Sequence, residues 1–246
     1  MAKATMVLYG KNSVRERLKA DPKSIRQVCL THDFAHEEIE RLIRASGIKI
    51  ERHTSKELGR MRPQKDLQGV LAHVEKYRYA AFQDLLAGDG KQKPTLVFLD
   101  RINDPQNLGV ILRTLACFGR FGVVLPEFKS CEVNETVLHV ASGAESYVPV
   151  AKVANLTNAM LNAKKAGYWL AGAVVEEGAQ DITVLSLPFP LALILGSEGE
   201  GLRYGVEKHL DIRVRIPMAG AALSFNVAMA CAIFAYEITR QRGASS

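Results

Sequence analysis

The 246-residue sequence has few cysteines and no long apolar run, and both absences exclude classes of protein. Its cysteines, Cys29, Cys117, Cys131 and Cys231, lie far apart, form no CxxC pair and have no Cys/His spacing that suits zinc. We therefore expect reduced, mostly buried thiols and no metal. No stretch reaches membrane-spanning length, and the strand-like TMVLYG begins almost at Met1, so we expect a cytoplasmic protein without a signal peptide.

Several motifs of nucleotide-binding proteins and hydrolases are also missing. The chain contains neither GxxxxGK[ST] nor GxSxG. The stretch GEGLRYG loosely resembles a dinucleotide-binding GxGxxG turn, but Tyr204 occupies the third glycine position, and Glu198 and Glu200 would put negative charge where a pyrophosphate must sit. His32 and His36 have a metal-compatible spacing but no apparent third ligand, so we interpret them as an exposed pair.

The net charge of +6 is unevenly distributed. Residues 1–92 hold 18 Lys and Arg against 12 Asp and Glu, whereas residues 93–246 hold 14 of each kind. A basic segment attached to a neutral one favours a polyanionic partner such as nucleic acid, and a solvated surface with extra lysines is the alternative. Candidate phosphate contacts, chosen by charge alone, are Arg15, Arg17, Arg60, Arg62 and Lys65.

The pattern of apolar residues predicts two α/β domains. The first alternates strands with helices, including one closed by Gly47 and one that begins at Thr54 with the capping box TSKE. Gly and Pro residues then break the pattern, as expected of a linker. The predicted boundaries are 1–78 for the first domain, 79–93 for the linker and 94–246 for the second domain.

The second domain is predicted to contain a parallel sheet covered by helices on both faces, because its strands are uniformly apolar and separated by helix-length segments. Three of its loops follow strands: NDPQNLGVILRT, LILGSEGEGLRYG and IPMAGAALSFNVAMA. Such loops gather at the carboxyl edge of a parallel sheet, where ligands bind. In the third loop, Ser224 and Asn226 could either cap the following helix or hold a ligand, and Asn107 could likewise cap its own helix.

These three loops carry a resemblance to a known family. NxGxxxR followed by FG (107–119), LGSEGEGL (195–202) and IPMxGxxxSxNVA (216–228) resemble the three motifs of the SpoU branch of the SPOUT methyltransferases. The stretch from YGKNSVRERL to LQGVLAHV is similar to the small RNA-binding domain of members that act on a guanosine of large-subunit ribosomal RNA. The resemblance implies transfer of a methyl group from S-adenosylmethionine to a ribose 2'-hydroxyl of RNA. It further implies a homodimer and a C-terminal trefoil knot.

The resemblance also assigns roles to individual residues. It implies that the cofactor is held at Gly196, Ile216, Met218 and Phe225, the last standing where the family usually has Leu. It implies a catalytic group of Asn107, Arg113, Glu198, Ser224 and Asn226. Because arginine is effectively always protonated, we expect Arg113 to bind a phosphate and position the ribose rather than to act as a base. We expect Glu198 to orient Arg113 or a neighbouring segment, and Asn107 and Asn226 to fix loops or the ribose.

Two other functions remain as alternatives. The first is ribose methylation of transfer RNA, which the small N-terminal domain disfavours only by analogy of domain type. The second is a non-catalytic RNA-binding factor in ribosome assembly that has kept the fold, and the intact catalytic group argues against it.

Overall fold

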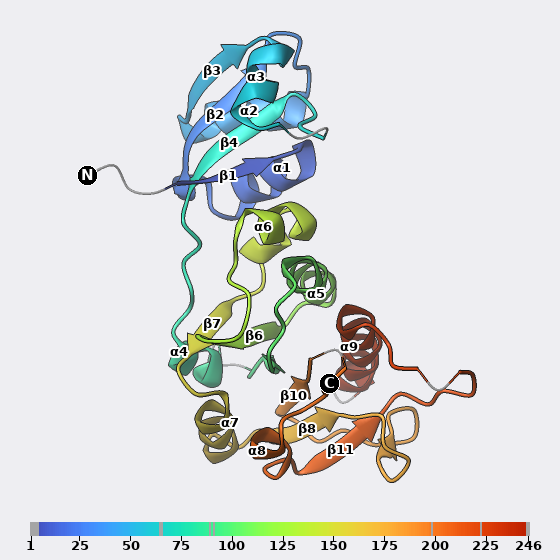
Figure 1. The fold of residues 1–246 in the computed structure, drawn as a ribbon. Coiled ribbons are helices and arrows are strands. Elements are labelled where there is room, and N and C mark those ends of the chain that lie inside the picture. The colour runs from blue at the N-terminus through green and yellow to red at the C-terminus, as the bar shows by residue number, and fades with distance from the viewer. Residues whose placement is uncertain are drawn as a thin grey trace. The chain divides into compact units, whose positions relative to one another are not determined.

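A computed structural model gives the fold of the chain, and it describes residues 5–63, 66–88, 90, 92–197, 199–221 and 223–244 (Figure 1). The chain forms two compact units. Unit 1 comprises Met1–Arg78 and Val133–Tyr147, and unit 2 comprises Tyr79–Glu132 and Val148–Ser246. Both are α/β units, as the sequence predicts.

Unit 1 is built on a four-stranded mixed sheet of order β1-β4-β2-β3. Strand β4 is antiparallel to both β1 and β2, whereas β2 and β3 are parallel. The elements are β1 (Thr5–Tyr9), α1 (Lys11–Ala20), η1 (Pro22–Ser24), β2 (Ile25–Thr31), α2 (Glu37–Ser46), β3 (Lys49–His53), α3 (Ser55–Met61), β4 (Val70–Glu75), α6 (Glu135–Ala141) and η2 (Ala144–Ser146). Strand β3 therefore forms one edge of this sheet.

The predicted helix ends in unit 1 are confirmed. The Thr54 hydroxyl accepts a hydrogen bond from the Glu57 amide at 3.2 Å, and the Glu57 carboxylate accepts one from the Thr54 amide at 2.8 Å, which completes the capping box of α3. Gly47 ends α2 with φ 64°, a left-handed conformation that glycine adopts without steric penalty.

The segment predicted as a linker, 79–93, contains a helix. Helix α4 (Phe82–Ala87) lies within it, and Phe82 and Leu85 are buried in the core of unit 2. The glycine and proline residues that follow this helix suggested a connector, but the apolar side chains that precede them are numerous enough to pack. Tyr79 onward therefore clusters with unit 2.

Unit 1 is also completed by a segment from the predicted second domain. Helix α6 packs on β1, where the Val7 amide donates to the Glu135 carboxylate at 2.7 Å and the rings of Tyr9 and His139 stack with centroids 4.3 Å apart. These contacts involve residues more than 120 positions apart in the sequence, so helical periodicity alone could not assign this segment to unit 1.

Unit 2 contains a seven-stranded sheet of order β7-β6-β5-β10-β8-β11-β9, and all of its strand pairs are parallel. The elements are β5 (Thr95–Leu99), α5 (Pro105–Phe118), β6 (Phe121–Pro126), β7 (Val150–Val153), α7 (Leu156–Lys165), β8 (Trp169–Ala173), β9 (Gln180–Asp181), β10 (Leu191–Leu195), α8 (Tyr204–Glu207), β11 (Ile212–Arg215) and α9 (Val227–Ala244). The predicted parallel sheet is thus confirmed.

The central strands explain why this sheet forms. Every residue of β5, β6 and β10 is buried, as expected of strands covered on both faces. Helix α9 packs against α5, and the rings of Phe118 and Tyr236 meet edge to face. Within the described ranges, none of the helices has the length and apolar character needed to span a membrane. The trefoil knot stays a prediction.

Candidate active site

A cavity of about 440 Å³ opens at the carboxyl edge of the sheet in unit 2. The ends of β8, β10 and β11 and the first turns of α9 surround it. The four residues expected to hold the cofactor, Gly196, Ile216, Met218 and Phe225, all line this cavity, and Ser224 lines it too. The volume lies within the usual range of small-molecule sites.

Gly196 allows two backbone segments of the cavity wall to approach each other. A Cβ atom at this position would lie 2.3 Å from the carbonyl carbon of Gly201 and 2.6 Å from the amide nitrogen of Leu202. The loop folds back here because the Gly201 amide donates to the Ser197 carbonyl at 3.0 Å. Only glycine fits this close approach without displacing the loop.

The charged side chains that line the cavity among the described residues are all carboxylates. They belong to Glu176, Glu200 and Glu207. Arg213 pairs with Glu176 at 2.8 Å and with Glu207 at 3.3 Å, and Arg101 pairs with Glu200. Two arginines therefore balance two of the three negative charges. The remaining negative charge suits a ligand that carries positive charge.

Asn226 begins helix α9 and also joins it to α5. Its side-chain oxygen accepts hydrogen bonds from the amides of Ala228 at 2.9 Å and Met229 at 3.4 Å, which caps the helix. Its side-chain nitrogen donates to the Asn107 side-chain oxygen at 3.0 Å. Of the two roles considered for Asn226, a helix cap or a ligand contact, the structure shows the cap. The side-chain nitrogen of Asn226 points toward α5.

Helix α5 carries the remaining described member of the predicted catalytic group. Arg113 lies in its second half and is exposed, so its guanidinium is accessible to a polyanion. Asn107 lies in the first turn of the same helix and contacts Asn226 as described. Glu198 lies outside the described residues.

Two arginines that the sequence analysis missed hold the loops around the cavity. Asp100, at the end of β5, is fully buried and accepts from the Arg203 side chain at 3.0 Å. Arg101 pairs with Glu200 and donates to the Gly201 carbonyl at 3.4 Å. These contacts join the loop after β5 to the loop after β10. For the Asp100–Arg203 pair, the available sequence signal was an aspartate directly after a fully apolar strand.

Cys231 lies on α9 next to the cavity-lining residue Ala230. Burial raises the pKa of its thiol to about 12. The thiol therefore stays protonated at neutral pH, and it is a poor nucleophile because the thiolate is the reactive form.

The predicted phosphate contacts in unit 1 have different surroundings. Arg17 is buried and its guanidinium lies 2.8 Å from the Glu145 carboxylate, so we remove it from the candidate RNA contacts. Arg62 pairs with Glu135, and Arg15 is half-buried and contacts Glu16 at 2.9 Å. The others are Arg60, which is exposed on α3, and Lys65, which lies outside the described residues.

The cavity at the carboxyl edge of a parallel sheet is typical of α/β proteins whose loops at that edge bind a small molecule. Residues 94–236 match the SpoU rRNA methylase family, and residues 7–80 match the RNA 2'-O ribose methyltransferase substrate-binding family. The chain belongs to the SpoU rRNA methylase family. The family resemblance seen in the three loop motifs is thereby confirmed.

Relatives and solved structures extend this match over nearly the whole chain. An uncharacterized tRNA/rRNA methyltransferase of Synechocystis is 35% identical to this chain. The match covers 96% of this chain and 63% of that relative. The 23S rRNA (guanosine-2'-O-)-methyltransferase RlmB of Pectobacterium atrosepticum is 34% identical, with 96% of this chain and 98% of the relative covered. The structure of the SpoU methyltransferase AviRb from Streptomyces viridochromogenes in complex with AdoMet has a TM-score of 0.81 at 23% identity, covering 98% and 91% of the two chains.

Proposed function

We propose that the protein methylates the ribose 2'-hydroxyl of a guanosine in 23S ribosomal RNA, with S-adenosylmethionine as methyl donor. The observation that carries the proposal is the cavity, which is lined by all four expected cofactor residues. Next to it, the Asn226–Asn107 hydrogen bond joins α9 to α5, the helix that bears Arg113. Membership of the SpoU rRNA methylase family supports the reaction. The RlmB name of a relative covered over nearly its full length supports the substrate.

The residues around the cavity fit the proposed cofactor. S-adenosylmethionine carries a sulfonium, whose methyl group is an electrophile, and an ammonium group. The carboxylates of Glu176, Glu200 and Glu207 complement these positive charges. Gly196 lets the backbone of Gly201 and Leu202 approach closely at one wall, while Ile216 and Phe225 supply apolar surface. Because Phe225 is 44% exposed, its ring has room to pack against the ligand.

The chain's own contribution to methyl transfer is mainly positioning. We infer that the Arg113 guanidinium, which stays protonated, binds the phosphate next to the target ribose and aligns the 2'-oxygen with the methyl group. S-adenosylmethionine held at Gly196, Ile216, Met218 and Phe225 would supply the methyl group as an electrophile, and solvent water would accept the proton that the 2'-hydroxyl loses. Asn107 and Asn226 fix the relative position of α5 and α9, and Ser224 faces the cavity. Glu198 remains a proposed partner of Arg113.

Unit 1 is proposed to bind the RNA substrate. Its match to a substrate-binding family supports this role. Exposed Arg60 and half-buried Arg15 are described candidates for phosphate contacts, and Arg62 and Lys65 stay candidates by charge alone. A second cavity, of about 330 Å³, lies in unit 1 between Lys11, Phe34 and Gln68 and provides a concave surface for a nucleotide. Binding through phosphate contacts should weaken steeply with salt, and a flat salt response would contradict this role.

A homodimer is proposed from the surface of α9. Met229 is 50% exposed and Tyr236 is 59% exposed, although both lie on a predominantly apolar helix. Burial of such side chains against a second copy would stabilise association. Sedimentation velocity of the full chain tests this, and a monomer at micromolar concentration would contradict it.

We also propose that the protein acts in the cytoplasm, where ribosomal RNA would be available.

The decisive experiment is transfer of labelled methyl from S-adenosylmethionine to unmodified 23S ribosomal RNA, with unmodified transfer RNA as a parallel substrate. Nuclease mapping should place the label in ribosomal RNA as 2'-O-methylguanosine. Label in transfer RNA alone would retain the chemistry and overturn the proposed substrate. Tight RNA binding without label in either would favour the non-catalytic assembly factor.

A further inference from the structure

Three potential metal ligands meet on one face of the sheet in unit 1. Strands β2 and β3 are parallel, with Cys29 in register with Glu51 and Thr31 in register with His53. Because side chains alternate between the two faces of a sheet, residues 51 and 53 project to the same face as residue 29. Register therefore gathers a thiol, a carboxylate and an imidazole that are separated by up to 24 positions in the sequence.

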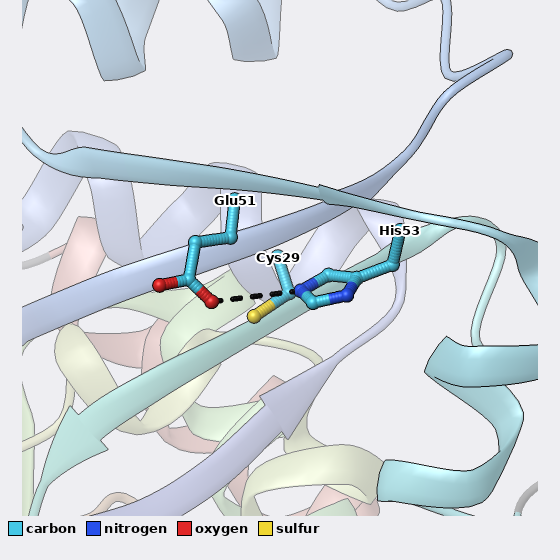
Figure 2. A group of neighbouring side chains, drawn as sticks. All are labelled: Cys29, Glu51 and His53. Carbon is cyan, nitrogen blue, oxygen red and sulfur yellow. Dashed lines mark ion pairs between the residues drawn. The ribbon is translucent and has the colours of Figure 1, made fainter.

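The ligand atoms of these side chains are close together. The Cys29 sulfur, a Glu51 carboxylate oxygen and an imidazole nitrogen of His53 all lie within 4.8 Å of one another. Glu51 Oε2 and His53 Nε2 are 3.6 Å apart. Figure 2 shows the sulfur between the carboxylate and the ring, with all three groups directed into the same space.

The His53 nitrogen also lacks a conventional partner. Nε2 is buried from solvent and makes no hydrogen bond within the described residues. A buried polar atom of this kind needs an explanation, since most such atoms are hydrogen-bonded. The nearby Lys49 does not supply it, because Lys49 contacts the other carboxylate oxygen of Glu51 at 2.7 Å. The Gln27 side chain, which donates to the Cys29 sulfur at 3.8 Å, does not supply it either, and Glu51 Oε2 lies 3.6 Å from His53 Nε2.

We propose that Cys29, Glu51 and His53 bind one divalent cation of the zinc class. A thiolate, an imidazole and a carboxylate are all zinc ligands, and metal–ligand distances of about 2.0–2.3 Å place tetrahedral ligand atoms roughly 3.5 Å apart. The Glu51–His53 separation already fits that value. A fourth position is left for water. The thiol disfavours Mg²⁺ and Ca²⁺, which take oxygen ligands.

The site has an entry path and a structural role. Cys29 is 1% exposed and forms its floor, whereas the side chains of Glu51 and His53 are 38% and 17% exposed and form its open side. Strand β3 is an edge of the sheet and has no buried residue, and among the described residues β2 is the strand that pairs with it. A metal bound across β2 and β3 would fasten this edge, since a ligand that binds only the folded state stabilises it.

No metal site is predicted from the sequence, because zinc motifs are recognised by short spacings between their ligands. Cys29 and His53 are far apart in sequence and meet only through the register of two parallel strands. The proposed site is distinct from the active site in unit 2, so it is tested without reference to methyl transfer.

Cobalt(II) titration of the full chain tests the proposal, with a phosphine reductant to keep thiols reduced. We expect one equivalent of Co²⁺ to bind and to produce the near-ultraviolet charge-transfer absorption of a thiolate–cobalt bond, with Zn²⁺ displacing it. Cys29→Ser should abolish this band. The matched control is Cys117→Ser, which removes an exposed cysteine and should leave the band unchanged.

A second variant keeps the test decisive if Cys29→Ser fails to fold. His53→Gln removes an imidazole that is partly exposed and should weaken Co²⁺ binding at least tenfold, with circular dichroism verifying the fold. The proposal is overturned if wild-type protein shows no thiolate–cobalt band at stoichiometric metal. It is equally overturned if the band persists in Cys29→Ser or if His53→Gln binds Co²⁺ as tightly as wild type.

Discussion

The two units use ion pairs in different ways. In unit 2, Asp100 is buried but its partner Arg203 has a side chain that is 44% exposed, and the pair joins two loops beside the cavity. In unit 1, both members of the Arg17–Glu145 pair are buried, and the pair joins α1 to η2. Both pairs join segments that are distant in sequence. The half-exposed pair in unit 2 supports loops beside the cavity, whereas the fully buried pair in unit 1 holds two helical segments together.

The largest expected effect falls on activity in unit 2. Arg113→Ala should reduce methyl transfer at least about a hundredfold, because it removes the cation proposed to position the RNA phosphate. S-adenosylmethionine affinity and the melting temperature should stay unchanged, since Arg113 is exposed and does not line the cavity. Single-turnover methylation measures the transfer rate, and calorimetric titration measures the affinity for S-adenosylmethionine. Arg113→Lys should recover only part of the rate, as it keeps the charge but loses the planar fork.

Near-wild-type turnover of Arg113→Ala would contradict the assigned role. Loss of cofactor binding in the same variant would instead mean that Arg113 supports the cavity rather than the RNA.

The next effect falls on the stability of unit 1. Arg17→Ala should lower its free energy of unfolding by about 3–5 kcal/mol, because it leaves the Glu145 carboxylate buried without its cation. The control Arg15→Ala, on the same helix but partly exposed, should change it by less than about 1 kcal/mol. Hydrogen exchange of the β1 and β4 amides measures unit 1 separately. Equal effects of the two variants would remove the distinction drawn between buried and exposed pairs.

The pH dependence of Arg17→Ala sharpens this test. Burial raises the pKa of Glu145, although Arg17 opposes the shift. A raised folded-state pKa means that the folded protein binds this proton more tightly than the unfolded chain, so stability from this group falls as pH rises from the usual glutamate range through the raised value. Without Arg17 the pKa should rise further. The deficit of Arg17→Ala should therefore shrink at acid pH, where Glu145 is protonated.

Much of unit 2 could be predicted from the sequence, because local patterns determine it. Fully apolar strands predicted a parallel sheet, and the loops that follow them had to meet at one edge. The helix ends at Gly47 and Thr54 in unit 1 could also be predicted, because the residues that cap a helix lie next to it in the sequence. The assignment of α6 to unit 1, the burial of Arg17 and the Cys29–His53 cluster depend on pairings across long sequence separations, which periodicity does not encode.

A smaller effect is expected at the cavity wall. Gly196→Ala places a methyl group 2.3 Å from the Gly201 carbonyl carbon, so the loop must shift. We expect destabilisation of about 1–3 kcal/mol, as for other overpacked sites, and S-adenosylmethionine affinity at least tenfold lower. The control is Gly205→Ala, where an added Cβ meets nothing within 4 Å. Thermal unfolding and calorimetric titration give both values, and unchanged affinity in Gly196→Ala would place the cofactor away from this wall.

The smallest effect separates two roles of one side chain. Asn226 caps α9 through its oxygen and donates to Asn107 through its nitrogen. Asn226→Ala removes both hydrogen bonds, so it should lower stability by about 1 kcal/mol and also reduce activity. Asn226→Asp keeps the capping oxygen and removes the side-chain donor. We therefore expect Asn226→Asp to retain the melting temperature and still lose methyl-transfer rate, because the hydrogen bond that aligns the first turns of α5 and α9 is lost. If Asn226→Asp matched wild type in both measurements, the Asn226–Asn107 bond would be dispensable, and capping alone would account for the residue.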